Sequence, residues 1–159
     1  MTTHRIECVV NGETHSLDVP TGRMLSDFLR DDLHLTGTKR GCETGVCGAC
    51  SILIDGEVVK SCLMLAAQVD GRNITTIEGL AEGDSLHPLQ ESFMKCGGLQ
   101  CGYCTPGMIM ASCDLLKNNP NPSVEEVQHA LSGNLCRCTG YTQIVESILH
   151  AAEEMNHGN

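Results

Sequence analysis

The spacing of the cysteines constrains this chain more than any other feature of its sequence. Eleven of the 159 residues are cysteine, while only 3% are aromatic and none is Trp. A chain of this length forms one ordinary domain or two small ones, and a small domain with a thin core needs a staple such as a disulfide or a metal. Eight of the cysteines fall into two sets, which are Cys42, Cys47, Cys50 and Cys62, then Cys101, Cys104, Cys136 and Cys138.

The rest of the sequence favours metal binding over disulfides. Residues 1–6 contain no apolar segment like that of a secretory signal, and the chain has no twin-arginine signal and no apolar run of membrane-spanning length. We therefore expect a cytoplasmic protein, in which thiols stay reduced. An odd number of cysteines also fits a disulfide framework poorly.

The first set has the spacing C-x4-C-x2-C followed by a distant fourth cysteine. This spacing is typical of plant-type [2Fe–2S] ligation, whereas structural zinc usually takes paired C-x2-C arms. Three thiolates from one short loop must wrap a flat cluster, and glycine accepts the turns most easily. Gly41, Gly45 and Gly48 meet that need and let peptide N–H groups approach the sulfurs of an anionic cluster.

The second set combines C-x2-C with C-x-C, and this spacing alone fits zinc and iron–sulfur equally. Position adds information, because Cys104 and Cys138 each precede a predicted helix. Thr105 is the expected N-cap of the first of these helices, with Pro106 at the first helical position. Helix starts offer free N–H groups and partial positive charge, which favour an anionic cluster.

The first half of the chain reads as strands joined by hairpins. Ile6, Cys8 and Val10 alternate with Glu7 and Val9 before a type I′ hairpin turn at Asn11-Gly12, and a second hairpin turn is expected at Asp55-Gly56. Residues 24–33 carry one apolar helical face. Residues 74–77 are expected to add a short strand. These elements predict a small α+β unit with a mixed sheet and one helix.

The second half reads as helices, predicted over residues 86–95, from 105 to about 118, from 124 to about 133, and over 141–155. Ser123 and Glu126 form a capping box for the third of them. Residues 78–85 contain Gly and acidic residues and are the expected junction. The predicted domains are therefore residues 1–78 and residues 79–159.

The sequence around the second set resembles a known family closely. The segments that carry the likeness are Gly41 to Cys50, Gln100 to Gly107 and Gly133 to Tyr141. They resemble the small iron–sulfur subunit of the molybdenum hydroxylases, which include xanthine dehydrogenase, aldehyde oxidoreductase, aerobic carbon monoxide dehydrogenase and N-heteroaromatic hydroxylases. The resemblance covers nearly the whole chain, with no departure at a ligand position.

This resemblance implies a fold, ligands and partners. The fold is a β-grasp ferredoxin domain followed by a four-helix bundle, each holding one [2Fe–2S] cluster. The partners are a large subunit that carries molybdopterin, in its cytosine dinucleotide form, and a medium subunit that carries FAD, assembled as a dimer of heterotrimers. Gln100 and Cys138 are implied to contact the molybdopterin.

The implied function is an electron relay. Substrate (a purine, an aldehyde, carbon monoxide or an N-heteroaromatic) is oxidised on the large subunit. Electrons then pass through the second cluster and the first cluster to FAD. Without the resemblance, the sequence supports only two clusters joined by a short linker. A free two-cluster ferredoxin and a zinc-stabilised adaptor therefore remain alternatives.

The remaining polar and thiol residues point to no further chemistry. Cys8 and Cys113 fall on apolar faces, and Cys96 is interpreted as a structural thiol because the second set is complete without it. Arg137 either tunes the cluster or pairs with an acid. The net charge of −10, without basic patches or a basic amphipathic helix, argues against nucleic acid and membrane partners.

Overall fold

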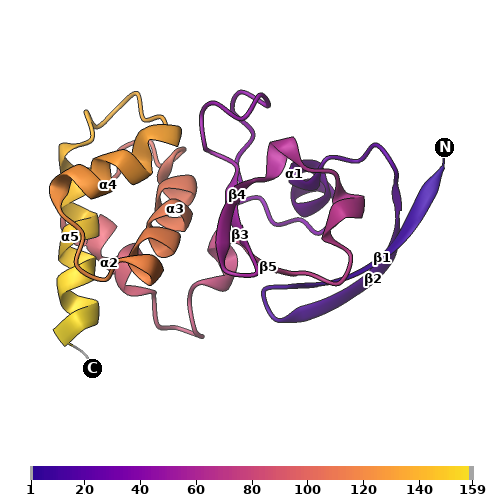
Figure 1. Ribbon diagram of the computed structural model, residues 1–159, viewed down its shortest axis with the longest axis horizontal. Coiled ribbons are helices and arrows are strands. Elements are labelled where there is room, and N and C mark those ends of the chain that lie inside the picture. Colours follow the sequence, from indigo (N-terminus) through magenta and orange to yellow (C-terminus); the bar gives the residue numbers. More distant parts are fainter. Residues whose placement is uncertain (1, 158–159) are drawn as a thin grey trace.

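The computed structural model describes residues 2–157 and has two parts that lie side by side (Figure 1). The first part is built on a five-stranded sheet of order β2-β1-β5-β3-β4. Its strands are β1 (Thr3–Val10), β2 (Glu13–Pro20), β3 (Ser51–Ile54), β4 (Glu57–Lys60) and β5 (Asn73–Thr75). Strands β1 and β5 pair in parallel and the other neighbours pair antiparallel, so the predicted mixed sheet is confirmed.

Both predicted hairpins are present. The φ angles are 52° and 85° at Asn11 and Gly12, and 51° and 84° at Asp55 and Gly56. Positive φ at both central residues is what a type I′ turn requires, and it keeps the twist of the flanking strands. The second hairpin matters for the site, because β4 leads directly into the short 3-10 helix η2 (Ser61–Leu63) that carries Cys62.

Beside the 3-10 helix η3 (Ala66–Val69), a longer helical segment covers the sheet. It begins as α1 (Leu25–Asp27) and continues as the π-helical turn η1 (Phe28–Asp32). Leu25, Phe28 and Leu29 are fully buried, as the apolar stripe predicted. They pack with the inward residues of β1, including Cys8, which is the small buried residue expected there.

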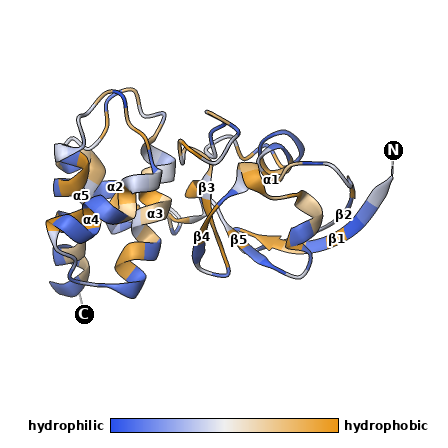
Figure 2. Cartoon of the chain, turned by 45° about the horizontal axis from the view of Figure 1, so that its top comes forward, coloured by the Kyte–Doolittle hydropathy of each residue, from blue (hydrophilic) through white to orange (hydrophobic). Residues whose placement is uncertain are grey.

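The second part consists of helices around a separate core. They are α2 (Pro88–Lys95), α3 (Thr105–Asn118), α4 (Val124–Ala130) and α5 (Thr142–His157). Phe93, Met108, Ile144 and Ile148 are fully buried in this core. The helices carry hydrophobic and hydrophilic residues on different sides (Figure 2). The chain is therefore an α+β protein with two hydrophobic cores.

Several predicted helix and strand ends differ from those in the structure. Helix α2 starts at Pro88 rather than at residue 86, because His87 is its N-cap and accepts from the Leu89 N–H at 3.2 Å. Cys104, not Thr105, precedes α3, which places Pro106 at its second position. Strand β5 ends at Thr75, two residues earlier than expected, and 3-10 helix η4 (Ile77–Gly79) follows.

The two parts meet where α3 packs against β3 and β4 (Figure 1). The capping box of Ser123 and Glu126 is confirmed, with the two reciprocal bonds at 2.7 and 3.2 Å. Helix α4 ends in a 3-10 turn, η5 (Leu131–Gly133), which delivers the chain to the second cysteine loop. Among the described helices, none is both long and apolar enough to cross a membrane.

Candidate metal centres

The first cysteine loop, residues 41–50, is an irregular segment between η1 and β3. Gly45 and Gly48 have φ angles of 77° and 69°, a conformation that side chains rarely adopt. A Cβ on Gly41 would also lie 2.8 Å from the Cys47 Sγ. The loop is therefore wrapped tightly around its own thiols, as the sequence predicted.

Peptide groups of this loop donate to the Cys42 sulfur. The N–H groups of Thr44 and Cys47 lie 3.4 and 3.3 Å from the Cys42 Sγ. Hydrogen bonding from the Thr44 side chain, and then from these N–H groups, lowers the pKa of Cys42 to about 6. Since the thiolate is the form that binds a metal, this residue is prepared for ligation.

Cys50 and Cys62 form the inner side of the same site. Both are buried, at 2% and 6% exposure, and their thiols are in contact. Burial, and then the contact with Cys50, raises the pKa of Cys62 to about 11. A thiolate here is costly unless a cation neutralises it, as iron does in a cluster.

The second set divides into an outer and an inner pair. The outer pair is Cys101 and Cys138, whose Sγ atoms are 3.5 Å apart and which are both exposed. The inner pair is Cys104 and Cys136, which are partly buried and in contact. Burial, and then the contact with Cys136, raises the pKa of Cys104 to about 12.

Hydrogen bonds shape the loop around Cys136. Its Sγ lies 3.1 Å from the Thr139 Oγ1 and receives the Thr139 N–H at 3.4 Å. Burial raises the pKa of Cys136, but these Thr139 contacts outweigh it and lower the pKa overall. The Tyr141 hydroxyl accepts the Cys136 N–H at 2.8 Å and donates to the Asn134 carbonyl at 3.3 Å.

The start of α3 adds an unused donor beside the second set. The Thr105 hydroxyl is buried and has no hydrogen-bond partner in the described part of the chain. It follows Cys104 directly, at a helix start where Pro106 has no N–H and the Thr105 N–H donates to the Gly102 carbonyl at 3.3 Å. Sulfide and thiolate sulfurs are acceptors, so the free Thr105 hydroxyl fits an iron–sulfur cluster.

The cysteines meet in pairs. The pairs are Cys50 with Cys62, Cys101 with Cys138 and Cys104 with Cys136, while Cys42 contacts the Cys47 backbone. Within residues 2–157, no three His, Cys, Asp or Glu side chains converge on the position of one metal ion. A [2Fe–2S] cluster has two irons, each of which takes two protein ligands, so pairs are the arrangement it uses.

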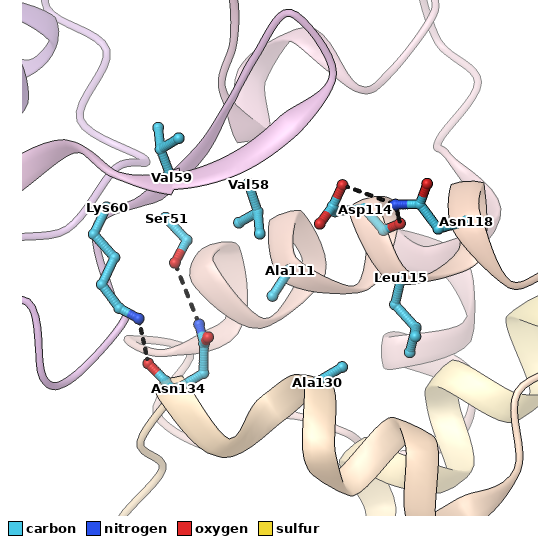
Figure 3. A pocket seen from close by; sticks show the side chains of 11 residues that line it. Ser51, Val58, Val59, Lys60, Ala111, Asp114, Leu115, Asn118, Ala130 and Asn134 are labelled. Atoms are coloured by element: carbon cyan, nitrogen blue, oxygen red, sulfur yellow. Dashed lines mark hydrogen bonds between the residues drawn. The ribbon is translucent and has the colours of Figure 1, made fainter.

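The two cysteine loops touch each other directly. The Leu135 N–H donates to the Cys47 carbonyl at 2.8 Å. The Asn134 amide donates to the Gly48 carbonyl at 3.1 Å. The Lys60 ammonium donates to the Gly133 carbonyl at 3.0 Å (Figure 3). Both candidate centres therefore lie at one junction between the two parts.

A further link between the loops involves Tyr103, which lies between two cysteines of the second set. Its hydroxyl donates to the carbonyl of Arg40, two residues before Cys42. The Arg40 guanidinium is itself held by Asp27 at 2.6 Å. The phenol therefore ties the second loop to a fixed point of the first part.

Sequence reasoning assigned no role to Asn134, Tyr141 or Tyr103, although all three lie within the motifs that it singled out. Their position inside the cysteine motifs was the available signal. Gln100 and Cys138, the predicted molybdopterin contacts, are both exposed. Cys96 ends α2, partly buried, and belongs to none of the pairs above.

Comparison with known proteins agrees with this geometry. A family model described as "2Fe-2S iron-sulfur cluster binding domain" matches residues 8–81, and one described as "[2Fe-2S] binding domain" matches residues 76–149. The nicotine 6-hydroxylase small subunit of Paenarthrobacter nicotinovorans is 54% identical, over 97% of this chain and 93% of its own. A probable xanthine dehydrogenase subunit of Bacillus subtilis is 48% identical, over 94% of this chain and 86% of its own.

A solved structure agrees as well. A chain of quinoline 2-oxidoreductase from Pseudomonas putida 86 superposes with a TM-score of 0.94 at 47% identity, with 98% of each chain covered. The fold and the two cysteine centres thus define an electron-transfer protein with two [2Fe–2S]-binding domains. The chain belongs to the small iron–sulfur subunits of the molybdenum hydroxylase family. It carries clusters rather than a substrate site.

Proposed function

We propose that this chain relays electrons from a molybdopterin centre on a large subunit to FAD on a medium subunit. The observation that carries the proposal is the hydrogen bond from the Leu135 N–H to the Cys47 carbonyl, at 2.8 Å. Each residue belongs to a different cysteine loop. The bond therefore gives the two centres a short connection through the backbone.

The proposed ligands follow from the pairs of thiols. The first cluster is held by Cys42, Cys47, Cys50 and Cys62, and the second by Cys101, Cys104, Cys136 and Cys138. Each cluster, when bound, accepts and releases one electron. The peptide N–H groups on Cys42 and Cys136 stabilise the negative charge that thiolates bring.

The exposure of the second set supports the proposed direction of transfer. Cys101 and Cys138 face solvent together with Gln100, whereas Cys104 and Cys136 are partly buried. Electrons would enter at the exposed pair and leave past the inner pair toward Cys47. Gln100 and Cys138 are the proposed contacts to the molybdopterin, taken to be the cytosine dinucleotide form.

The first loop offers a second contact surface. Val46 and Leu63, which stand next to the ligands Cys47 and Cys62, are 61% and 60% exposed. Leu63 lies against Gly45, where an added Cβ would be 2.5 Å from its Cδ1. An apolar surface over the first centre is what docking of the FAD subunit there requires.

We place the domain boundary between residues 78 and 79. Separate hydrophobic cores on each side support this division, and the two family models overlap only at residues 76–81. The first domain would be the β-grasp ferredoxin domain. Helices α2, α3, α4 and α5 would form the four-helix bundle domain.

The proposed assembly is a dimer of heterotrimers in the cytoplasm. Relatives are named as the small subunit of nicotine 6-hydroxylase, subunit beta of a 6-hydroxypseudooxynicotine dehydrogenase complex and subunit gamma of caffeine dehydrogenase. Each name implies further chains. The substrate of this complex would be an N-heteroaromatic, an aldehyde, a purine or carbon monoxide, selected by the large subunit.

Co-expression with the genes next to this one tests the proposal. We expect fixed stoichiometry with one molybdenum-binding chain and one FAD-binding chain, and reduction of both clusters when substrate is added. A monodisperse monomer that exchanges electrons freely, and binds neither chain when co-expressed, would instead identify a free two-cluster ferredoxin.

A further inference from the structure

Asn134 uses its side chain entirely across the junction between the two parts. It is buried, at 5% exposure, although its side chain is polar. Its Nδ2 donates to the Gly48 carbonyl at 3.1 Å. The same atom lies 3.5 Å from the Ser51 Oγ (Figure 3). Both partners belong to the first part, so a residue of the second part is anchored there.

The backbone of Asn134 is fixed on its own side. Its N–H donates to the Leu131 carbonyl at 2.9 Å, and its carbonyl accepts the Tyr141 hydroxyl at 3.3 Å. The next residue, Leu135, donates its N–H to the Cys47 carbonyl. Because the Leu135 side chain is 52% exposed, it provides little anchoring for that peptide. The anchor comes from the residue before it.

The two parts are closely packed at the junction, and an added methyl group at either of two glycines would not fit there. A Cβ on Gly48 would clash with the Gly133 carbonyl and would lie 2.6 Å from the Asn134 Cγ. A Cβ on Gly107 would clash with the Gly48 carbonyl. The backbones of both parts are thus in direct contact at the point that the Asn134 amide binds.

We propose that Asn134 is a positioning residue for electron transfer between the two clusters, an inference that rests on the proposed relay. Its amide holds the Leu135 N–H on the Cys47 carbonyl. This keeps a continuous path from Cys136, through one peptide and one hydrogen bond, to Cys47. With both clusters bound, one electron would pass from the cluster held by the second set to the cluster held by the first, and no bond would form or break.

The test uses the complex purified with its partner subunits and carrying Asn134→Ala. Asn118→Ala is the matched control. Asn118 and Asn134 both line a pocket between β4 and α3, but Asn118 donates to the Asp114 carbonyl of its own helix at 2.9 Å (Figure 3). Asn134→Asp is a second variant that keeps the side-chain size and replaces the donor by an acceptor. Iron content shows whether both clusters are assembled.

Two measurements show whether the Leu135 peptide and the two clusters keep their positions in the variants. Hydrogen exchange at the Leu135 amide should become about tenfold faster in both Asn134 variants, which corresponds to a lost buried hydrogen bond of about 1.4 kcal/mol. Electron transfer between the clusters should slow. The magnetic interaction between the two reduced clusters should become weaker and take a broader range of values, because their relative position is less fixed. Asn118→Ala should match the wild type in each measurement.

The outcomes are distinguishable. Unchanged Leu135 exchange and an unchanged inter-cluster rate, with iron retained, would overturn the role of Asn134 and leave the relay intact. Loss of iron in both Asn134 variants would also overturn it, because Asn134 would then serve assembly. If the wild-type complex passes no electrons between its clusters, the proposed function fails instead.

Discussion

The Leu135 N–H donates to the Cys47 carbonyl at 2.8 Å, and this bond connects the two cysteine loops of the chain. Cys47 lies in the loop between η1 and β3, and Leu135 immediately precedes Cys136. The two residues are 88 positions apart in the sequence. The relay proposed for this subunit depends on that contact between two distant segments.

The first prediction concerns metal content. Eight cysteines in two sets should bind about four irons per chain, with two distinct paramagnetic signals after reduction and no essential zinc. Iron and zinc analysis together with electron paramagnetic resonance on the purified complex would measure this. Two irons and a single signal would show that the chain binds only one of the two predicted clusters.

The second prediction separates ligands from other thiols. Cys47→Ser or Cys104→Ser should lose its own cluster, leave about two irons, and destabilise that half, because ligation is coupled to folding. Cys96→Ser is the control and should retain both clusters, since Cys96 is the C-cap of α2 and belongs to none of the thiol pairs described above. Iron loss from Cys96→Ser together with iron retention in Cys101→Ser would show that the ligand assignment is wrong.

The third prediction concerns the contact between the backbones at the junction. Gly48→Ala should destabilise the protein, because its φ of 69° disfavours a side chain and its Cβ would clash with Gly133 and Asn134. Gly12→Ala has a similar φ of 85° but would meet nothing within 4 Å. Both variants should lose about 1–2 kcal/mol of unfolding free energy because a side chain disfavours positive φ. Gly48→Ala should lose about 1–3 kcal/mol more because of the clash.

Thermal or denaturant unfolding of the two glycine variants would measure the difference. Equal losses would mean that the junction adjusts to an added methyl group. A larger loss for Gly48→Ala, accompanied by faster hydrogen exchange at Leu135, would confirm that the two parts are held together at this point.

The fourth prediction concerns pH and the start of α2. The His87 Nδ1 accepts the Leu89 N–H, and burial lowers the pKa of His87 below its ordinary 6.5. The folded state therefore favours the neutral ring. This contribution to stability is present above pH 6.5 and is lost as pH falls through the folded-state pKa, because the charged ring cannot accept.

Replacing His87 by Asn, which caps without titrating, isolates this effect. Between pH 8 and pH 5 the wild type should lose about 1 kcal/mol more unfolding free energy than His87→Asn. Urea unfolding of both proteins across this range measures it. Parallel stability curves would show that the cap does not depend on protonation.

The fifth prediction concerns Gln100. Because this exposed residue precedes Cys101, Gln100→Ala should slow reduction of the clusters by substrate while iron content stays at the wild-type value. Gln128→Ala, on the exposed side of α4, is the control and should behave as the wild type. Stopped-flow reduction of the whole complex gives both rates. Equal rates in all three proteins would remove Gln100 from the path.

Local patterns in the sequence determined much of this protein. The hairpins at Asn11-Gly12 and Asp55-Gly56 require positive φ, which those residues accept, so their turns could be assigned without tertiary contacts. The capping box at Ser123 is similarly local. The spacing of the first cysteine set indicated a [2Fe–2S] cluster, because ligation of a flat cluster by one loop restricts both spacing and glycine content. The spacing of the second set fitted zinc and iron–sulfur equally.

Contacts between distant segments could not be predicted in this way. Thr105 looked like an N-cap, yet Cys104 takes that place, because its carbonyl accepts the first hydrogen bond of α3 from the Met108 N–H at 3.0 Å. The pairing of Leu135 with Cys47, and the burial of the Asn134 amide against Gly48, arise only when α3 packs on β3 and β4. The cysteine spacing determined which thiols are available, and the packing of the two parts decided how the two sets face each other. The physical reason is that spacing is set by bonds along the chain, whereas the junction depends on two separate cores fitting together.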